Sequence, residues 1–176
     1  MKQHFLRNTL GVSLVEFLWG LGMPVVMEST FLQLYLRDLG ASNFLIGLIP
    51  TFFSGGLALS SLLAVSLTSH LRRKRTAVIT AHVGAALPIL LFGLLSLAVD
   101  LGPARMGVFF LFYGLFSLGI GLILPIWQNY LVKIFSPDQS VPALAVMWMT
   151  QSVTKILGSY VILRTVERYA FATRSV

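Results

Sequence analysis

Lys155 is the most informative single residue of the sequence, because it stands in the middle of the apolar stretch from Pro142 to Leu163. An ammonium group at the midplane of a bilayer costs on the order of 3 kcal/mol unless it reaches a partner or an aqueous cavity. Leu163 lies roughly 12 Å further along a helix, which is far for the side chain to snorkel to the interface. We therefore expect Lys155 to bind a solute or an ion, with snorkelling as the alternative.

Lys155 belongs to a polar stripe that we expect to face the interior of a helix bundle. The stripe has helical spacing and comprises Trp148, Gln151, Ser152, Lys155 and Ser159. Glu28, in the first apolar stretch, is the natural counter-ion because it falls at a similar depth. We predict that Glu28 and Lys155 approach each other across a cavity and bind a substrate or a coupling ion. A purely structural ion pair is the alternative.

A second candidate wall comes from the apolar stretch that precedes the one with Lys155. Its polar or small residues share one helical face and could line a cavity with hydrogen-bonding groups; they are Tyr113, Ser117, Gly121 and Gln128. Trp127 lies near the inner end of this stretch, where an interfacial Trp usually anchors a helix. His82 is expected to form a hydrogen bond to a neighbouring helix, with a proton relay as the alternative.

Glu16 is the second carboxylate of the first apolar stretch. It points about 120° away from Glu28 on an ideal helix, so the two are not expected to share a site unless the helix bends. We expect Glu16 to lie near the cytoplasmic headgroups.

The composition indicates that these residues stand in membrane helices. Hydrophobic residues make up 56% of the chain and charged residues 11%, whereas soluble domains have about a quarter of their residues charged. The 13 Lys and Arg against 6 acids lie between apolar runs, where they orient helices rather than bind nucleic acid. The absence of Cys excludes disulfides and thiol catalysis. No enzyme motif appears, and we expect no enzyme, no cofactor and no metal site.

The pattern predicts an all-α polytopic bundle in which residues 1–176 form a single domain. Its five expected spans cover residues 10–36, 44–69, 77–99, 106–132 and 142–163. Gly20, Gly22 and Pro24 predict a bend or local unwinding in the first span. Ser42 or Asn43 can cap the second span, and Ser136-Pro137-Asp138 is expected to end one helix and start the next. In the second span, small residues recur at intervals of four and should let another backbone approach closely. These residues are Gly56, Ser60, Ala64 and Thr68.

The basic cluster from Arg72 to Arg75 decides the orientation, because positive loops remain in the cytoplasm. We predict an integral protein of the cell membrane with its N-terminus in the cytoplasm. The loops at residues 37–43 and 100–105 and the tail after Arg164 would then lie outside.

The order of these parts resembles the N-terminal half of a major facilitator superfamily transporter. The resemblance rests on the run Leu36–Ser42 followed by Ile46-Gly47, the short basic loop after the second span, the run Pro125–Leu131, and the turn Ile134–Asp138. The family's loop between spans two and three usually carries Gly and Asp-Arg before its basic residues. Here Ser66 and His70 fall near the Gly and Asp positions. The Arg motif of the fourth span is absent, so no coupling mode is implied.

The resemblance implies two six-helix halves around a central cavity, each an inverted repeat, and secondary transport of a small solute by alternating access. Expected partners are the solute, a coupling proton or ion, the lipid bilayer, and the remaining C-terminal helices or a second bundle. The pattern lacks a sixth span and leaves open whether a longer protein continues past Val176. The alternative function is that of a non-transporting membrane protein that assembles with another bundle.

Overall fold

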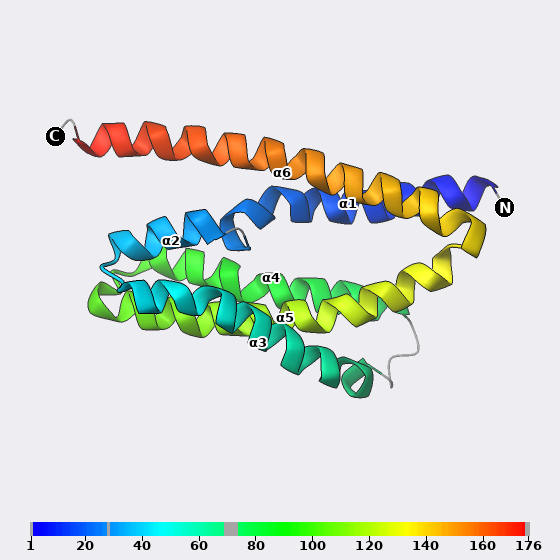
Figure 1. The fold of residues 1–176 in the computed structure, drawn as a ribbon, viewed down its shortest axis with the longest axis horizontal. Helices are drawn as coiled ribbons and strands as arrows, with labels where there is room; N and C mark the ends of the chain where they lie inside the picture. The colour runs from blue at the N-terminus through cyan, green and yellow to red at the C-terminus, as the bar shows by residue number, and fades with distance from the viewer. Residues whose placement is uncertain (1, 28, 69–73, 175–176) are drawn as a thin grey trace. The chain divides into compact units, whose positions relative to one another are not determined.

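A computed structural model describes residues 2–27, 29–68 and 74–174, and the secondary structure of these residues is helical. This confirms the predicted all-α class. In chain order the helices are α1 (Lys2–Val26), α2 (Ser29–Asp38), α3 (Asn43–Thr68), α4 (Lys74–Ala98), the 3-10 turn η1 (Gly102–Ala104), α5 (Arg105–Ile134) and α6 (Pro137–Arg174) (Figure 1).

Within the described residues, four helical segments are long and apolar enough to cross a membrane, as in an integral membrane protein. They are His4–Asp38, Asn43–Ala64, Arg75–Ala98 and Gly102–Ile134, and they correspond to the first four predicted spans. The stretch predicted as a fifth span, residues 142–163, is not among them, since its polar side chains make it less apolar. It lies inside α6, which is longer than predicted at both ends.

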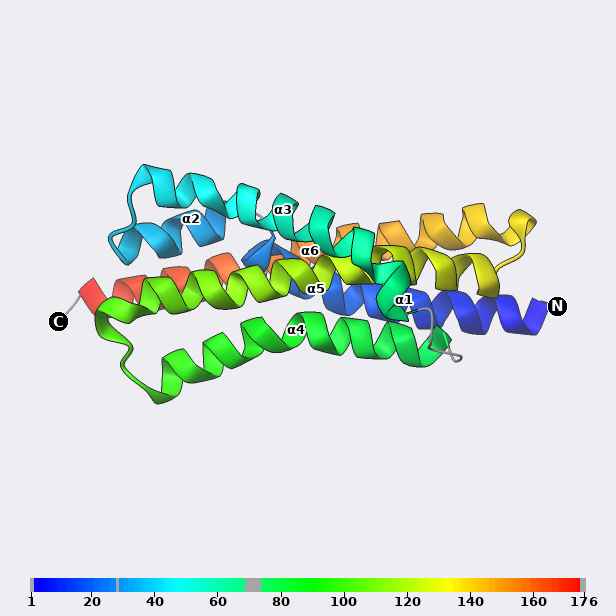
Figure 2. The same ribbon diagram turned by 90° about the horizontal axis from the view of Figure 1, so that it is seen from below.

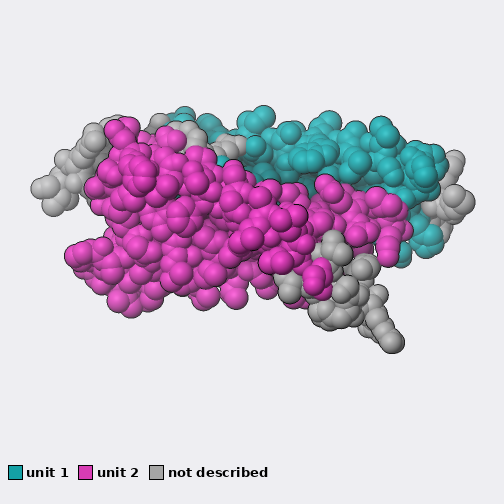
Figure 3. All heavy atoms as spheres, turned by 60° about the horizontal axis from the view of Figure 1, so that its bottom comes forward, with its two compact units in different colours: residues 1–32, 134–176 teal, residues 33–133 magenta. Residues whose placement is uncertain are grey.

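The chain forms two compact units, coloured separately in Figure 3. Unit 1 comprises residues Met1–Leu32 and Ile134–Val176, and unit 2 comprises Gln33–Lys133. The boundaries fall within α2 and at the end of α5. The expectation of one bundle over residues 1–176 stays a prediction.

Unit 1 consists mainly of α1 and α6, which pack side by side (Figures 1 and 2). At one end, the Phe5 and Phe135 rings meet edge to face with centroids 6.1 Å apart. Near the other end, Gly158 lies so close to Leu21 that a Cβ built on the glycine would stand 3.1 Å from the Leu21 carbonyl oxygen. Contacts therefore advance in the same order along both helices, which run parallel.

The first predicted span is divided between α1, which ends at Val26, and α2, which begins at Ser29, shortly after the segment Gly20–Pro24 where a bend is predicted. Pro24 lies in the last turn of α1, where it cannot donate a backbone hydrogen bond to the preceding turn. The last bond of this helix end runs from the Met27 amide to the Met23 carbonyl, at 2.9 Å. A new helix then starts at Ser29.

Unit 2 is organised by close approaches of α3 and α4 to α5. A Cβ built on Gly56 would lie 2.6 Å from the Ser117 Cβ, and one on Gly121 would lie 2.6 Å from the Leu57 carbonyl oxygen. Ser61 donates a hydrogen bond across this seam to the Gly121 carbonyl, at 3.0 Å. The small-residue ridge predicted in the second span thus packs on α5, as far as its described side chains extend.

The α4–α5 contact is equally tight. A Cβ on Gly119 would lie 2.6 Å from the Ala85 Cα. Aromatic rings close the same unit at the end where α2 terminates, with Tyr35 beside Phe109 (centroids 5.7 Å apart) and beside Phe92 (6.3 Å). The helices of unit 2 are therefore held together in two ways: small residues pack against neighbouring backbones, and aromatic rings pack against one another.

The turn after α2 shows why a glycine stands there. Gly40 has a φ of +80°, which only glycine adopts without strain. The amides of Gly40 and Ala41 donate to the carbonyls of Arg37 and Leu36, at 2.9 Å each, and close the helix end in a Schellman motif. Ser42 Oγ then accepts a long hydrogen bond (3.4 Å) from the Leu45 amide, so the predicted cap of the next helix is Ser42.

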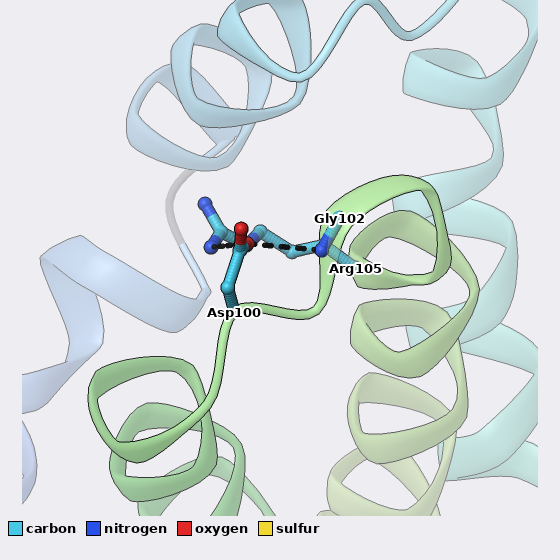
Figure 4. Close-up of polar contacts among 3 residues, drawn as sticks. All are labelled: Asp100, Gly102 and Arg105. Atoms are coloured by element: carbon cyan, nitrogen blue, oxygen red, sulfur yellow. Dashed lines mark hydrogen bonds and ion pairs between the residues drawn. The ribbon is translucent and has the colours of Figure 1, made fainter.

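The turn between α4 and α5 is held by Asp100 (Figure 4). Its Oδ1 accepts from the Gly102 amide at 3.1 Å and pairs with Arg105 Nη2 at 3.4 Å. At the start of α6, Pro137 occupies the first helical position, and the Ser136 carbonyl accepts from the Gln139 and Ser140 amides. The predicted helix break at Ser-Pro-Asp is thus confirmed.

Candidate functional site

The polar centre of unit 1 is a buried hydrogen bond between α1 and α6. Gln151 Nε2 donates to Glu16 Oε2, and the two residues are only 6% and 7% exposed. Hydrogen bonds to a charged acceptor are the strong ones, especially where water and lipid supply no competing donor. The carboxylate therefore lies in the seam between α1 and α6, whereas the expected depth of Glu16 near the cytoplasmic headgroups stays a prediction.

Glycine makes this hydrogen bond geometrically possible. One turn after Glu16, Gly20 faces Thr154 and the Gln151 backbone so closely that a Cβ on the glycine would lie 2.8 Å from the Gln151 carbonyl oxygen. Thr154 satisfies its own hydroxyl within α6, donating to the Thr150 carbonyl at 2.6 Å. The small side chain brings the two backbones together, so that the side chains of Glu16 and Gln151 can meet.

Lys155 lies one turn beyond Gln151 on α6 and is half-buried. By helical position it stands at the edge of the face that carries Gln151, 40° away from it on an ideal helix with 100° per residue. The structure therefore places an ammonium group beside the seam, on the same helix as the donor to Glu16. The predicted partner of Lys155, Glu28, lies outside the described residues.

The remainder of the predicted stripe on α6 points away from the seam. Trp148, Ser152 and Ser159 are exposed, whereas Gln151, Thr154 and Gly158 are buried and contact α1. The face of α6 that packs on α1 is thus rotated about the helix axis relative to the predicted stripe. Gln151 belongs to both the packed face and the predicted stripe, and Lys155 lies at the edge between the two.

The second predicted wall, on α5, is used largely for packing in unit 2. Tyr113 is buried and stacks on Phe109, with centroids 5.5 Å apart. Ser117 is fully buried beneath Gly56 of α3 and donates to the Tyr113 carbonyl at 2.8 Å. Gln128 is exposed. The Ser117 hydroxyl is therefore already used within its own helix, and its predicted role in lining a cavity stays a prediction.

His82 and Trp127 form a pair that the sequence did not suggest. Their rings meet edge to face with centroids 5.4 Å apart, and Trp127 also stacks on Tyr130. His82 Nδ1 lies 2.8 Å from the Val78 carbonyl, which can only accept, so Nδ1 carries the proton. Trp127 is buried between helices rather than anchored at the interface, which corrects the expectation for it.

No group of His, Cys, Asp and Glu side chains suited to a metal ion occurs in the part of the chain that the structure describes. Comparisons of the chain with known protein families, with curated proteins and with solved structures found no match. The functional argument consequently rests on the residues and their geometry.

Proposed function

We propose that the chain is the N-terminal part of a secondary transporter of the major facilitator type, in which α6 is the fifth span and a small solute crosses by alternating access. The observation that carries the proposal is the parallel pairing of α1 with α6 around the buried Glu16–Gln151 hydrogen bond.

The direction of α6 supports a fifth crossing. If the chain crosses the membrane once in the first candidate span and once in each of α3, α4 and α5, then α6 starts on the side where α1 starts. α6 then follows α1 in the same direction, from the Phe5–Phe135 contact to the Leu21–Gly158 contact. A helix paired in this way with a membrane span crosses the same hydrocarbon layer.

The outer face of α6 supports the same proposal. The side opposite Gln151 carries exposed apolar side chains, namely Met149, Val153, Ile156 and Tyr160. Such a face suits lipid, whereas Gln151 and Thr154 lie toward α1 and Lys155 lies at the edge of the seam. The low mean hydropathy of α6 thus reflects its polar inner side, as in helices that line a transport path.

Transport itself is supported by polar and charged groups beside a first span that is divided into two helices. Glu16, Gln151 and Lys155 bring a carboxylate, an amide and an ammonium group to one level of unit 1. The interruption between α1 and α2 lies beyond that level and gives the first span a place to bend. We propose that these three residues, with Glu28 and Trp148, bind the solute or a coupling ion.

The experiment is a transport assay with the full-length gene product in proteoliposomes. A panel of radiolabelled sugars, amino acids and organic cations is offered with and without a proton gradient. We expect saturable uptake of at least one solute, lost in Lys155→Ala and retained in the control Ser159→Ala, whose side chain is exposed on the same helix. A correctly folded protein that moves none of these solutes, and that purifies only with another membrane protein, would instead support an assembly role.

A further inference from the structure

We infer that Glu16 is a proton-binding site that water reaches from the N-terminal end of α1 along the hydroxyls of Ser13 and Thr9. The inference concerns unit 1 alone and does not require that the chain transports a solute. It rests on three observations: the buried carboxyl group, the chemistry of its partner, and two buried hydroxyls without a protein partner.

The partner of Glu16 can serve both protonation states of the carboxyl group. In the structure the Gln151 amide nitrogen donates to the carboxylate. If the amide turns over, its oxygen accepts from the protonated acid in the same place, since Gln carries a donor and an acceptor on one carbon. A Lys or Arg in its place would have donors only, and would hold the group in its charged form.

The hydroxyls of Ser13 and Thr9 differ from other helical hydroxyls that form a hydrogen bond within their own helix, and in unit 1 they are the two described helical hydroxyls that are buried without a partner. Thr150, Thr154 and Ser117 each donate to a carbonyl one turn earlier in their own helix. Ser13 and Thr9 are only 8% and 6% exposed, yet neither hydroxyl has a hydrogen-bond partner among the described protein atoms. A buried polar group of this kind is normally satisfied by an ordered water molecule.

The spacing of these groups gives the path its direction. Thr9, Ser13 and Glu16 follow one another at steps of four and three residues, so they lie on one face of α1 and roughly 6 and 5 Å apart along its axis. By helical position this is also the face that carries Gly20 toward α6. One water molecule between successive hydroxyls spans such a step, and Thr9 lies within two turns of the polar N-terminal end.

The charged groups around the site are few. On α1, Arg7 and His4 are exposed and precede Thr9. On α6, the helix packed against α1 in unit 1, Lys155 is the charged residue of the stretch 142–163, and it lies one turn beyond Gln151. Protonation of Glu16 would thus remove a negative charge from the unit that also carries the Lys155 ammonium group, and would change the charge balance of unit 1.

Infrared spectroscopy of the purified chain in lipid nanodiscs tests the inference. Among the carboxylic-acid C=O bands of the six Asp and Glu residues, a pH titration should show one component that is missing in Glu16→Gln, and this component should shift when the buffer is changed to D2O. We expect the shift to develop about tenfold more slowly in Ser13→Ala and in Thr9→Val, each of which removes one hydrogen-bonding step. Thr150→Val, which removes a hydroxyl bonded within α6, should leave the rate unchanged.

Either of two results would overturn the inference. One is a spectrum in which Glu16→Gln removes no pH-dependent band, or in which the carboxylate band responds to Na⁺ at constant pH but not to pH. The other is an exchange rate equal to that of the unmodified chain in both Ser13→Ala and Thr9→Val. Helix content from circular dichroism confirms that each variant is folded before its spectrum is compared.

Discussion

At the scale of single residues, the account depends on Gln151 as the donor to a buried carboxylate. Glu16 and Gln151 stand 135 positions apart in the sequence. Each was recognisable as a polar residue in an apolar stretch, and Gln151 was singled out as a binding residue. Their contact could not be predicted, because it depends on which faces two distant helices present to each other. For the same reason Trp127 was assigned to the interface, whereas the His82 ring covers it in the structure.

Replacing Gln151 by Leu should destabilise the protein, because it leaves the Glu16 carboxyl group buried without this donor. The expected loss is about 1–3 kcal/mol in the free energy of unfolding. Unfolding of the detergent-solubilised chain by SDS, followed by circular dichroism, measures the change. Ser152→Ala, at the exposed neighbouring position, is the matched control and should have no measurable effect. Equal stability of the two variants would contradict a structural role for the Glu16–Gln151 bond.

At the scale of helices, the boundaries that follow from local chemistry were predicted well. Pro24 marks the end of α1, Ser42 caps α3, and Ser136-Pro137 separates α5 from α6. The length of α6 was not predicted, since its polar C-terminal part resembles a loop in composition yet continues the helix to Arg174. The polar composition of this part of α6 indicates that its side chains prefer water. It does not exclude a helix, because the backbone hydrogen bonds of a helix form inside the segment in water as well as in lipid.

The α3–α5 seam predicts different effects for two glycines of the same helix. Gly121→Ala would push a methyl group into the Leu57 carbonyl and should cost about 1–3 kcal/mol of stability by overpacking. Gly107→Ala meets nothing within 4 Å and should be neutral or stabilise by up to about 1 kcal/mol through helix propensity. SDS unfolding of both variants checks the pair. A loss in Gly107→Ala as large as that in Gly121→Ala would mean that the seam is not the cause.

The turn after α2 allows a similar comparison for backbone conformation. Gly40→Ala should lower the free energy of unfolding by about 1–2 kcal/mol, because alanine is strained at a positive φ. Gly47→Ala, in the exposed first turns of α3 with open space around it, serves as the control. Thermal unfolding in detergent compares the two. If Gly40→Ala is as stable as Gly47→Ala, the left-handed turn is not formed as described.

At the scale of the whole molecule, membrane integration follows from the length and apolar composition of the helices, whereas transport is a proposal. In the part of the chain that the structure describes, four helical segments are apolar and long enough to cross a bilayer. The fifth crossing and the transporter function remain proposals built on the parallel α1–α6 pair. The sequence pattern alone identified the apolar stretches. It could not show that residues 142–163, the least apolar of these stretches, lie beside α1.

Transport by the full-length protein should depend on Glu16 and Lys155 jointly. If both charges act in one site, the losses of uptake in Glu16→Gln and Lys155→Ala should be non-additive in the double variant, with a coupling of about 0.5–3 kcal/mol. Initial uptake rates of whichever solute the panel identifies supply the four corners of the cycle. Strictly additive losses would show that the two residues act independently.

The most direct test of the account is the side of the membrane on which each end of α6 lies. The chain contains no Cys, so Asp138→Cys and Thr165→Cys each introduce a single thiol at an exposed position, one near each end of the predicted span. Intact cells are treated with a membrane-impermeant maleimide before and after permeabilisation. A fifth crossing predicts that Thr165→Cys is labelled in intact cells and that Asp138→Cys is labelled only after permeabilisation. Labelling of both positions from the same side would contradict the account.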